Sequence, residues 1–75
     1  MSKQEIDRPR QLIIARRLME LRKKAGILQA KAAADMGMNI GSVEAARKDI
    51  SISSLEKLCR YYGVTLAEFF EDLEI

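Results

Sequence analysis

The sequence predicts an all-α fold, a compact orthogonal bundle of five helices joined by short turns. Three observations support this prediction. Apolar residues recur at helical spacing in five segments, no segment shows the sustained polar–apolar alternation of a strand, and glycines or capping residues separate the segments. We expect a flexible arm over residues 1–8 and one domain over residues 9–75. A chain of 75 residues buries only about 60% of its unfolded surface, so tight packing or dimerisation has to stabilise it.

The first helix is expected to begin near Pro9, because a proline in the first turn needs no hydrogen-bond donor. Asp7 precedes it as a possible cap. Gly26 can take the left-handed conformation that ends a helix. The buried face of this helix consists of Ile14, Leu18, Leu21 and Ala25, spaced by three or four residues.

Two short helices follow. Residues 29–36 are rich in alanine, which favours a helix and lets a neighbouring helix approach closely. Gly37 ends this segment, and Asn39 is expected to cap a helix over residues 40–48. Ile40, Val43 and Ala46 would face inward from that helix.

Capping signals also begin the last two helices. The fourth is capped by Ser51 or by Ser53, which has Glu56 three residues later as a capping box, and it ends at Gly63. Thr65 and Glu68 form a second capping box. The apolar positions are Leu55, Leu58, Cys59 and Tyr62 in the fourth helix, and Leu66, Phe69, Phe70 and Leu73 in the fifth.

Composition argues against several classes of protein. The chain has one cysteine and no histidine. It therefore has too few ligands for a zinc site, cannot form an internal disulfide and lacks the commonest general base, histidine. We therefore expect no catalytic residues, metal or cofactor, and no small-molecule substrate. No stretch approaches the roughly 20 apolar residues of a membrane span, and the N-terminus lacks an apolar signal core, so we expect a cytoplasmic protein and no membrane partner.

The charge is unevenly distributed. Residues 1–48 hold 11 Lys and Arg against 5 Asp and Glu, whereas residues 49–75 hold 2 against 6. A basic front and an acidic tail suggest one face for a polyanion such as nucleic acid.

Two stretches resemble a known family. Residues 21–29 (LRKKAGILQ), with Ala33, residues 36–38 (MGM) and residues 42–44 (SVE), resemble the Cro/repressor-type (Xre-like) helix-turn-helix. Residues 50–59 (ISISSLEKLC) and 63–70 (GVTLAEFF) resemble the fourth and fifth helices of that family, especially in controller proteins of restriction–modification systems. The resemblance implies a lambda-repressor-like fold, binding to double-stranded operator DNA as a homodimer, and a role as a transcriptional regulator or repressor.

The resemblance also implies roles for individual residues. Gln29 would lie near a phosphate, and Arg22 would pair with a glutamate at the end of the recognition helix. The DNA-facing side of that helix, which makes the base contacts, would hold Asn39, Ile40, Gly41, Ser42 and Ala45.

The chain departs from the family pattern after Gly37, where it is about three residues shorter. In one alignment Arg47 replaces the usual glutamate, the following loop is trimmed, and Arg22 loses its partner. In the other, Glu44 is that glutamate and the recognition helix has lost a turn. We expect the first, because it leaves a helix long enough to pack Ile40, Val43 and Ala46.

Few side chains on this helix can read base edges, so direct readout looks thin. Charged residues near the turn and on the arm would add phosphate contacts, whose contribution falls with salt: Lys31, Arg47, Lys48, Arg8 and Arg10. The C-terminal end is more apolar than a monomer needs, and a dimer interface is expected at Phe69, Phe70, Leu73 and Ile75. The alternative function is a protein-interaction module, an antirepressor or adaptor, that kept the fold and lost DNA binding.

Overall fold

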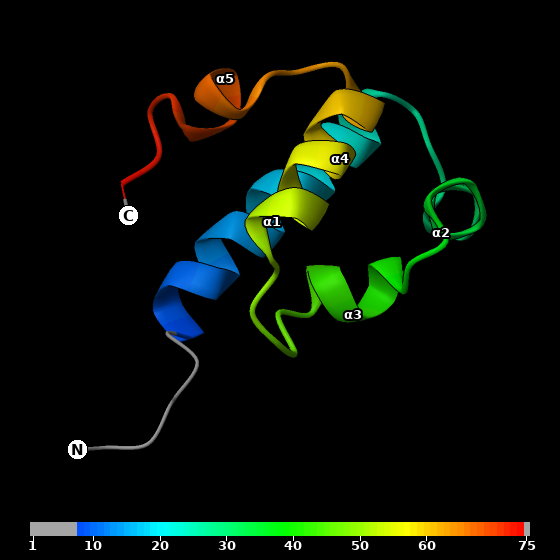
Figure 1. Ribbon diagram of the computed structural model, residues 1–75, viewed down its shortest axis with the longest axis horizontal. Helices are drawn as coiled ribbons and strands as arrows, with labels where there is room; N and C mark the ends of the chain where they lie inside the picture. The colour runs from blue at the N-terminus through cyan, green and yellow to red at the C-terminus, as the bar shows by residue number, and fades with distance from the viewer. Residues whose placement is uncertain (1–7, 75) are drawn as a thin grey trace.

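A computed structural model describes residues 8–74 and is all-helical over that range. The five helices are α1 (Arg8–Lys24), α2 (Gln29–Met36), α3 (Ile40–Glu44), α4 (Ile52–Tyr62) and α5 (Leu66–Phe70). The long helices α1 and α4 lie against each other, with α2 and α3 on one side of the pair and α5 on the opposite side (Figure 1). Asp7, the expected cap of the first helix, and the arm residues 1–7 lie outside the described range.

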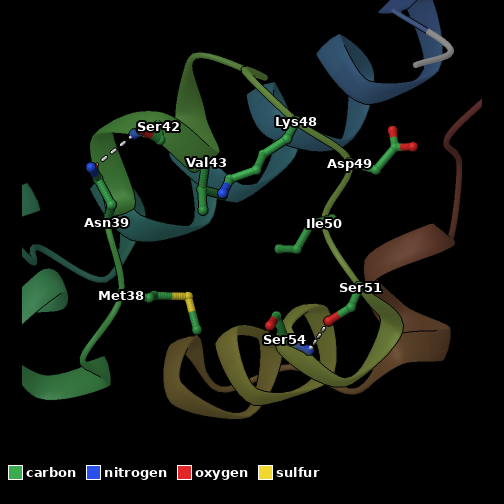
Figure 2. A pocket seen from close by; sticks show the side chains of 9 residues that line it. All are labelled: Met38, Asn39, Ser42, Val43, Lys48, Asp49, Ile50, Ser51 and Ser54. Atoms are coloured by element: carbon green, nitrogen blue, oxygen red, sulfur yellow. Dashed lines mark hydrogen bonds between the residues drawn. The ribbon is translucent and has the colours of Figure 1, made fainter. Parts of the chain in front are cut away.

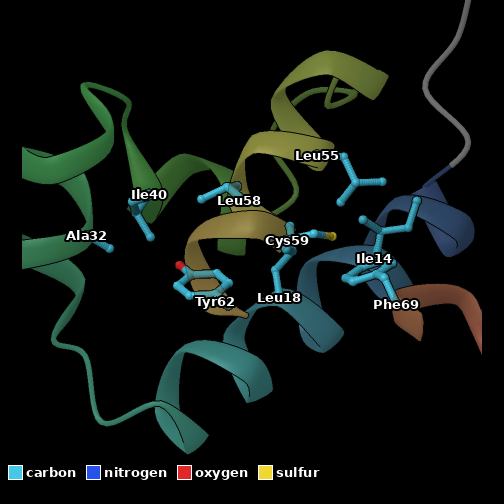
Figure 3. Close-up of a cluster of buried hydrophobic side chains, with 9 residues drawn as sticks. All are labelled: Ile14, Leu18, Ala32, Ile40, Leu55, Leu58, Cys59, Tyr62 and Phe69. Atoms are coloured by element: carbon cyan, nitrogen blue, oxygen red, sulfur yellow. The ribbon is translucent and has the colours of Figure 1, made fainter. Parts of the chain in front are cut away.

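A single apolar cluster connects all five helices (Figure 3). Leu18, Leu55, Leu58 and Phe69 are each 1% exposed, so the centre of the bundle is closed to solvent. Burial of one such side chain contributes about 1.5–3 kcal/mol. The cluster consists of Ile14, Leu18, Ala32, Ile40, Leu55, Leu58, Cys59, Tyr62 and Phe69.

The capping residues behave as the sequence predicts at three helix starts. Asn39 Oδ1 accepts a hydrogen bond from the Ser42 N–H at 3.0 Å. Ser51, and not Ser53, caps α4, because its hydroxyl accepts from the Ser54 N–H at 3.1 Å. Thr65 and Glu68 form the capping box of α5: each side chain accepts a hydrogen bond from the backbone N–H of the other.

The third helix is shorter than expected. The prediction of a helix over residues 40–48 is wrong, because α3 ends at Glu44 and Ala46 takes a left-handed conformation with φ 55°. The Ala46 N–H donates to Val43 O and the Arg47 N–H donates to Ser42 O, which is the hydrogen-bond pattern of a Schellman helix end. Ala46 is still buried, as expected, but from a turn and not from a helix.

A smaller difference concerns the end of α1. Ala25, expected on the buried face, lies in the turn after the helix and is exposed. In its place, the end of α1 buries Arg22, which is 7% exposed.

Candidate nucleic-acid interface

A tight turn joins α2 to α3. Gly37 has φ 65°, where a Cβ atom would be strained, and its N–H closes α2 by donating to Ala33 O at 2.9 Å. Met38 and Asn39 complete the turn and lead directly into α3. Ala32 is fully buried in α2, and its small side chain leaves room for the two helices to cross closely.

An ion pair between α1 and α3 fixes the end of α3. Arg22 Nε lies 2.6 Å from Glu44 Oε2, and Arg22 Nη2 lies 3.1 Å from Glu44 Oε1. The two side chains are only 9% and 5% exposed. Arg22 Nη1 also donates to Ile27 O at 2.8 Å. The hydrogen bond from Glu44 raises the pKa of Arg22 above its ordinary value, although burial opposes the shift.

This pair decides between the two alignments. Glu44 meets Arg22, so the expectation that Arg47 replaces the family glutamate and leaves Arg22 without a partner is wrong. The five-residue α3 matches the other alignment, in which the recognition helix lost a turn. Physically, a buried guanidinium needs a carboxylate close by, and Glu44 supplies one where Arg47 would supply a second positive charge.

Gln29, expected near a phosphate, is exposed at the first position of α2. Its Nε2 donates to Glu44 Oε1 at 3.0 Å, so the carboxylate that holds Arg22 also orients this amide. The residue before it, Leu28, is 75% exposed and gives α2 no side-chain cap.

The five residues expected to contact bases divide into two groups. Ile40 is 1% exposed and packs in the core, so its assignment as a base contact is wrong. Asn39, Gly41 and Ala45 are exposed and Ser42 is half-buried. Because Asn39 Oδ1 already caps α3, the exposed surface of this helix offers little to a base edge.

The residues expected to contact phosphates lie in different environments. Arg47 and Lys48 are exposed on the connector between α3 and α4. Lys31 is exposed on α2 and pairs with Asp35 at 2.9 Å. Arg10 is exposed on α1. Arg8 belongs to the first turn of α1, not to an arm, and its Nη1 donates to Ala46 O.

A hollow of about 410 Å³ separates α3 from the start of α4. Met38, Val43 and Ile50 line it with apolar side chains, the Lys48 side chain extends across it toward Val43, and Asp49 points away (Figure 2). No feature of the sequence pointed to this hollow, because it forms only where the connector between α3 and α4 folds back and brings residues 38–43 opposite residues 48–54.

The sequence pattern also did not predict a polar contact between Asp35 of α2 and Tyr61 of α4. The Tyr61 hydroxyl donates to Asp35 Oδ2, which also accepts from Lys31. This bond raises the pKa of Tyr61 to about 12 and, first among its causes, lowers the pKa of Asp35. The Lys31–Asp35 spacing of four residues was a signal for their pairing, but nothing local identified Tyr61.

The expected dimer residues lie in different environments. Phe69 is 1% exposed and belongs to the core, so it has no surface to offer a second copy. Phe70 is 37% exposed, and Leu73 lines a second hollow together with Leu12 and Ile13 of α1. Ile75 lies outside the described residues.

None of the helices over residues 8–74 is long and apolar enough to cross a membrane.

Comparison with known proteins agrees with this geometry. A family model described as helix-turn-helix matches residues 18–69. The HTH-type transcriptional regulators PuuR of Escherichia coli (strain K12) and of Shigella flexneri are each 37% identical to the chain over 62 aligned residues. Each match covers 79% of this chain and 34% of the relative. The chain thus spans about a third of the length of these relatives. No solved structure gave a significant match. These matches show that the chain belongs to the helix-turn-helix family, of the Cro/repressor type found in transcriptional regulators, and the turn at Gly37 between α2 and α3 agrees with it.

Proposed function

We propose that the chain is the DNA-binding domain of a cytoplasmic transcriptional regulator, with no catalytic role, that docks α3 against the major groove of operator DNA. The observation that carries this proposal is the α2–turn–α3 unit, which has Gln29 at one end and the exposed Arg47 and Lys48 at the other. In this arrangement α2 crosses the phosphate backbone and α3 enters the groove.

Phosphate contacts account for most of the expected affinity. Arg47 and Lys48 follow α3 directly and are exposed, so both can reach one strand while Gln29 and Lys31 reach the backbone near α2. Contacts of this kind release counterions and make the affinity depend steeply on salt. The few base contacts that the short helix allows come from its exposed side and ends: Asn39, Gly41, Ser42 and Ala45.

The test is fluorescence anisotropy of a labelled random duplex at two salt concentrations. We expect binding at low salt, and a loss of affinity in the double variant Arg47→Gln/Lys48→Gln, with the slope of log affinity against log salt shallower by about 1.8 for two lost contacts. Lys57→Gln/Arg60→Gln removes the same charge from the exposed face of α4 and serves as the matched control. Absence of low-salt binding by the wild type would refute the proposal.

The short α3 favours a second candidate, a protein-interaction module that kept the fold. A five-residue helix that exposes Gly41, and is followed by the exposed Ala45, offers few groups that distinguish base pairs. The same low-salt titration separates the two, because an adaptor of this kind does not bind duplex.

We further propose that the domain acts as a homodimer through Phe70 and Leu73, with Ile75, because a two-fold pair matches repeated half-sites. Light scattering of the wild type and of Phe70→Ser checks this: a dimer that the variant weakens is expected. If the wild type is a dimer and Phe70→Ser has the same mass, the interface lies elsewhere. A monomeric wild type would refute the proposed homodimer.

A further inference from the structure

The connector between α3 and α4 is held at two points by the first turns of α1. Arg8 Nη1 donates to Ala46 O, near the start of the connector. The Ile50 N–H, at its other end, donates to Gln11 Oε1 at 3.3 Å. Both contacts join residues nearly forty positions apart in the chain.

The connector needs such support because its own structure is unfavourable. Ala46 has a Cβ atom in a left-handed conformation where glycine is usual. Arg47, Lys48 and Asp49 are exposed and belong to no helix, so local packing does little to hold them. The two contacts from α1 therefore fix the path of the segment that carries Arg47 and Lys48.

We infer that Gln11 and Arg8 are positioning residues for DNA binding: they hold the connector so that Arg47 and Lys48 meet the phosphate backbone. This inference rests on the proposed function. It also changes the role of Arg8, whose guanidinium acts through the Ala46 carbonyl and not by direct contact with DNA.

The decisive variant is Gln11→Met, which has nearly the same size, removes the acceptor for the Ile50 N–H and leaves the net charge unchanged. We expect duplex affinity to fall about threefold to tenfold, with a salt slope shallower by about 0.9, as for one lost phosphate contact. A purely structural defect would lower the melting temperature without changing the slope measured for the folded protein.

Two controls sharpen the test. In a Lys48→Gln/Arg47→Gln background, Gln11→Met should have almost no further effect on affinity, because residues that act through one another are not additive. Arg8→Met should weaken binding more than Arg16→Met, which removes the same charge from an exposed position of α1.

Hydrogen exchange gives a readout that does not involve DNA. Gln11→Met should speed exchange of the Ile50 amide, and Gln11→Glu, which keeps the acceptor oxygen, should restore its protection. Wild-type binding together with an unchanged Gln11→Met slope, or unchanged exchange at Ile50, overturns the positioning role alone. Absence of wild-type binding at low salt overturns the proposed function instead.

Discussion

Replacing Glu44 by glutamine tests how much of the stability depends on one buried ion pair. The substitution keeps the size of the side chain but turns one carboxylate oxygen into an NH2 group. The NH2 group would replace the oxygen that accepts a hydrogen bond from Arg22 Nε at 2.6 Å or from Arg22 Nη2 at 3.1 Å. Two hydrogen-bond donors would then face each other. The guanidinium keeps its charge and stays buried, with 9% of its side chain exposed.

The expected cost follows from these contacts. One charge-assisted hydrogen bond contributes about 1.5–3 kcal/mol, and breaking a buried pair from one side costs about 3–5 kcal/mol. We therefore expect Glu44→Gln to lower the free energy of unfolding by about 3 kcal/mol. A domain of this length has only about 4–11 kcal/mol in total, so the melting temperature should fall by about 12–24 °C.

Urea denaturation followed by circular dichroism measures this loss. The double variant Arg22→Met/Glu44→Leu is the control, because an apolar pair of similar volume removes the uncompensated charge and should recover most of the stability. If Glu44→Gln unfolds within about 0.5 kcal/mol of the wild type, the pair does not hold α3 in the way we describe.

Three further predictions concern stability and titration. Ser51→Ala should cost about 1 kcal/mol and Ser53→Ala almost nothing, because only Ser51 caps α4; equal losses in thermal denaturation would contradict this. Ala46→Gly should change the unfolding free energy by less than about 1 kcal/mol, because relief of left-handed strain opposes the loss of a buried methyl, whereas Ala46→Val should cost about 2 kcal/mol or more in urea denaturation. The Tyr61 ring should titrate by NMR near pH 12, and Asp35→Asn should return its pKa toward 10.0; a Tyr61 pKa that does not respond to this change rules out the contact.

The pH dependence of the Tyr61–Asp35 contact has a definite sign. Folding raises the pKa of Tyr61, so the stabilisation is complete below pH 10.0 and is lost as the pH rises toward about 12. Folding lowers the pKa of Asp35, so its contribution is present above the ordinary value of 3.8 and is lost as the pH falls through the lowered value. The contact therefore makes its full contribution to stability between about pH 4 and pH 10.

The helices were predictable where their signals are local. Gly37, Asn39 and the Thr65–Glu68 box each act within four residues, and each occurs in the structure as the sequence indicates. The competition between Ser51 and Ser53 was open because both residues have the chemistry of a cap, and only the path of the connector selects Ser51.

The end of α3 was not predictable by the same means. An alanine rarely adopts φ 55°, so nothing at Ala46 indicated a stop. The last residue of the helix, Glu44, is instead held by Arg22 of another helix, a contact between residues 22 positions apart that no local pattern marks. The sequence also did not show which of Phe69 and Phe70 is buried, because both are apolar positions of the same helix. Only packing of α5 against the rest of the bundle buries Phe69 and leaves Phe70 exposed.

The two sides of α3 differ in how freely their residues can be substituted. Ile40 and Glu44 secure the helix from its inner side, whereas Gly41 and the C-cap residue Ala45 are exposed. A Cβ atom at Gly41 would lie 3.4 Å from Asn39 Oδ1 and 3.7 Å from Gln29 Oε1, which is ordinary van der Waals contact. A new side chain at Ala45, or a small one at Gly41, can therefore alter what the surface recognises at little cost to folding. A transplanted fragment of α2 and α3 would not inherit that freedom, since its anchor, Arg22, belongs to α1. The smallest unit that engineering or evolution can exchange is thus the three-helix portion, not the helix-turn-helix by itself.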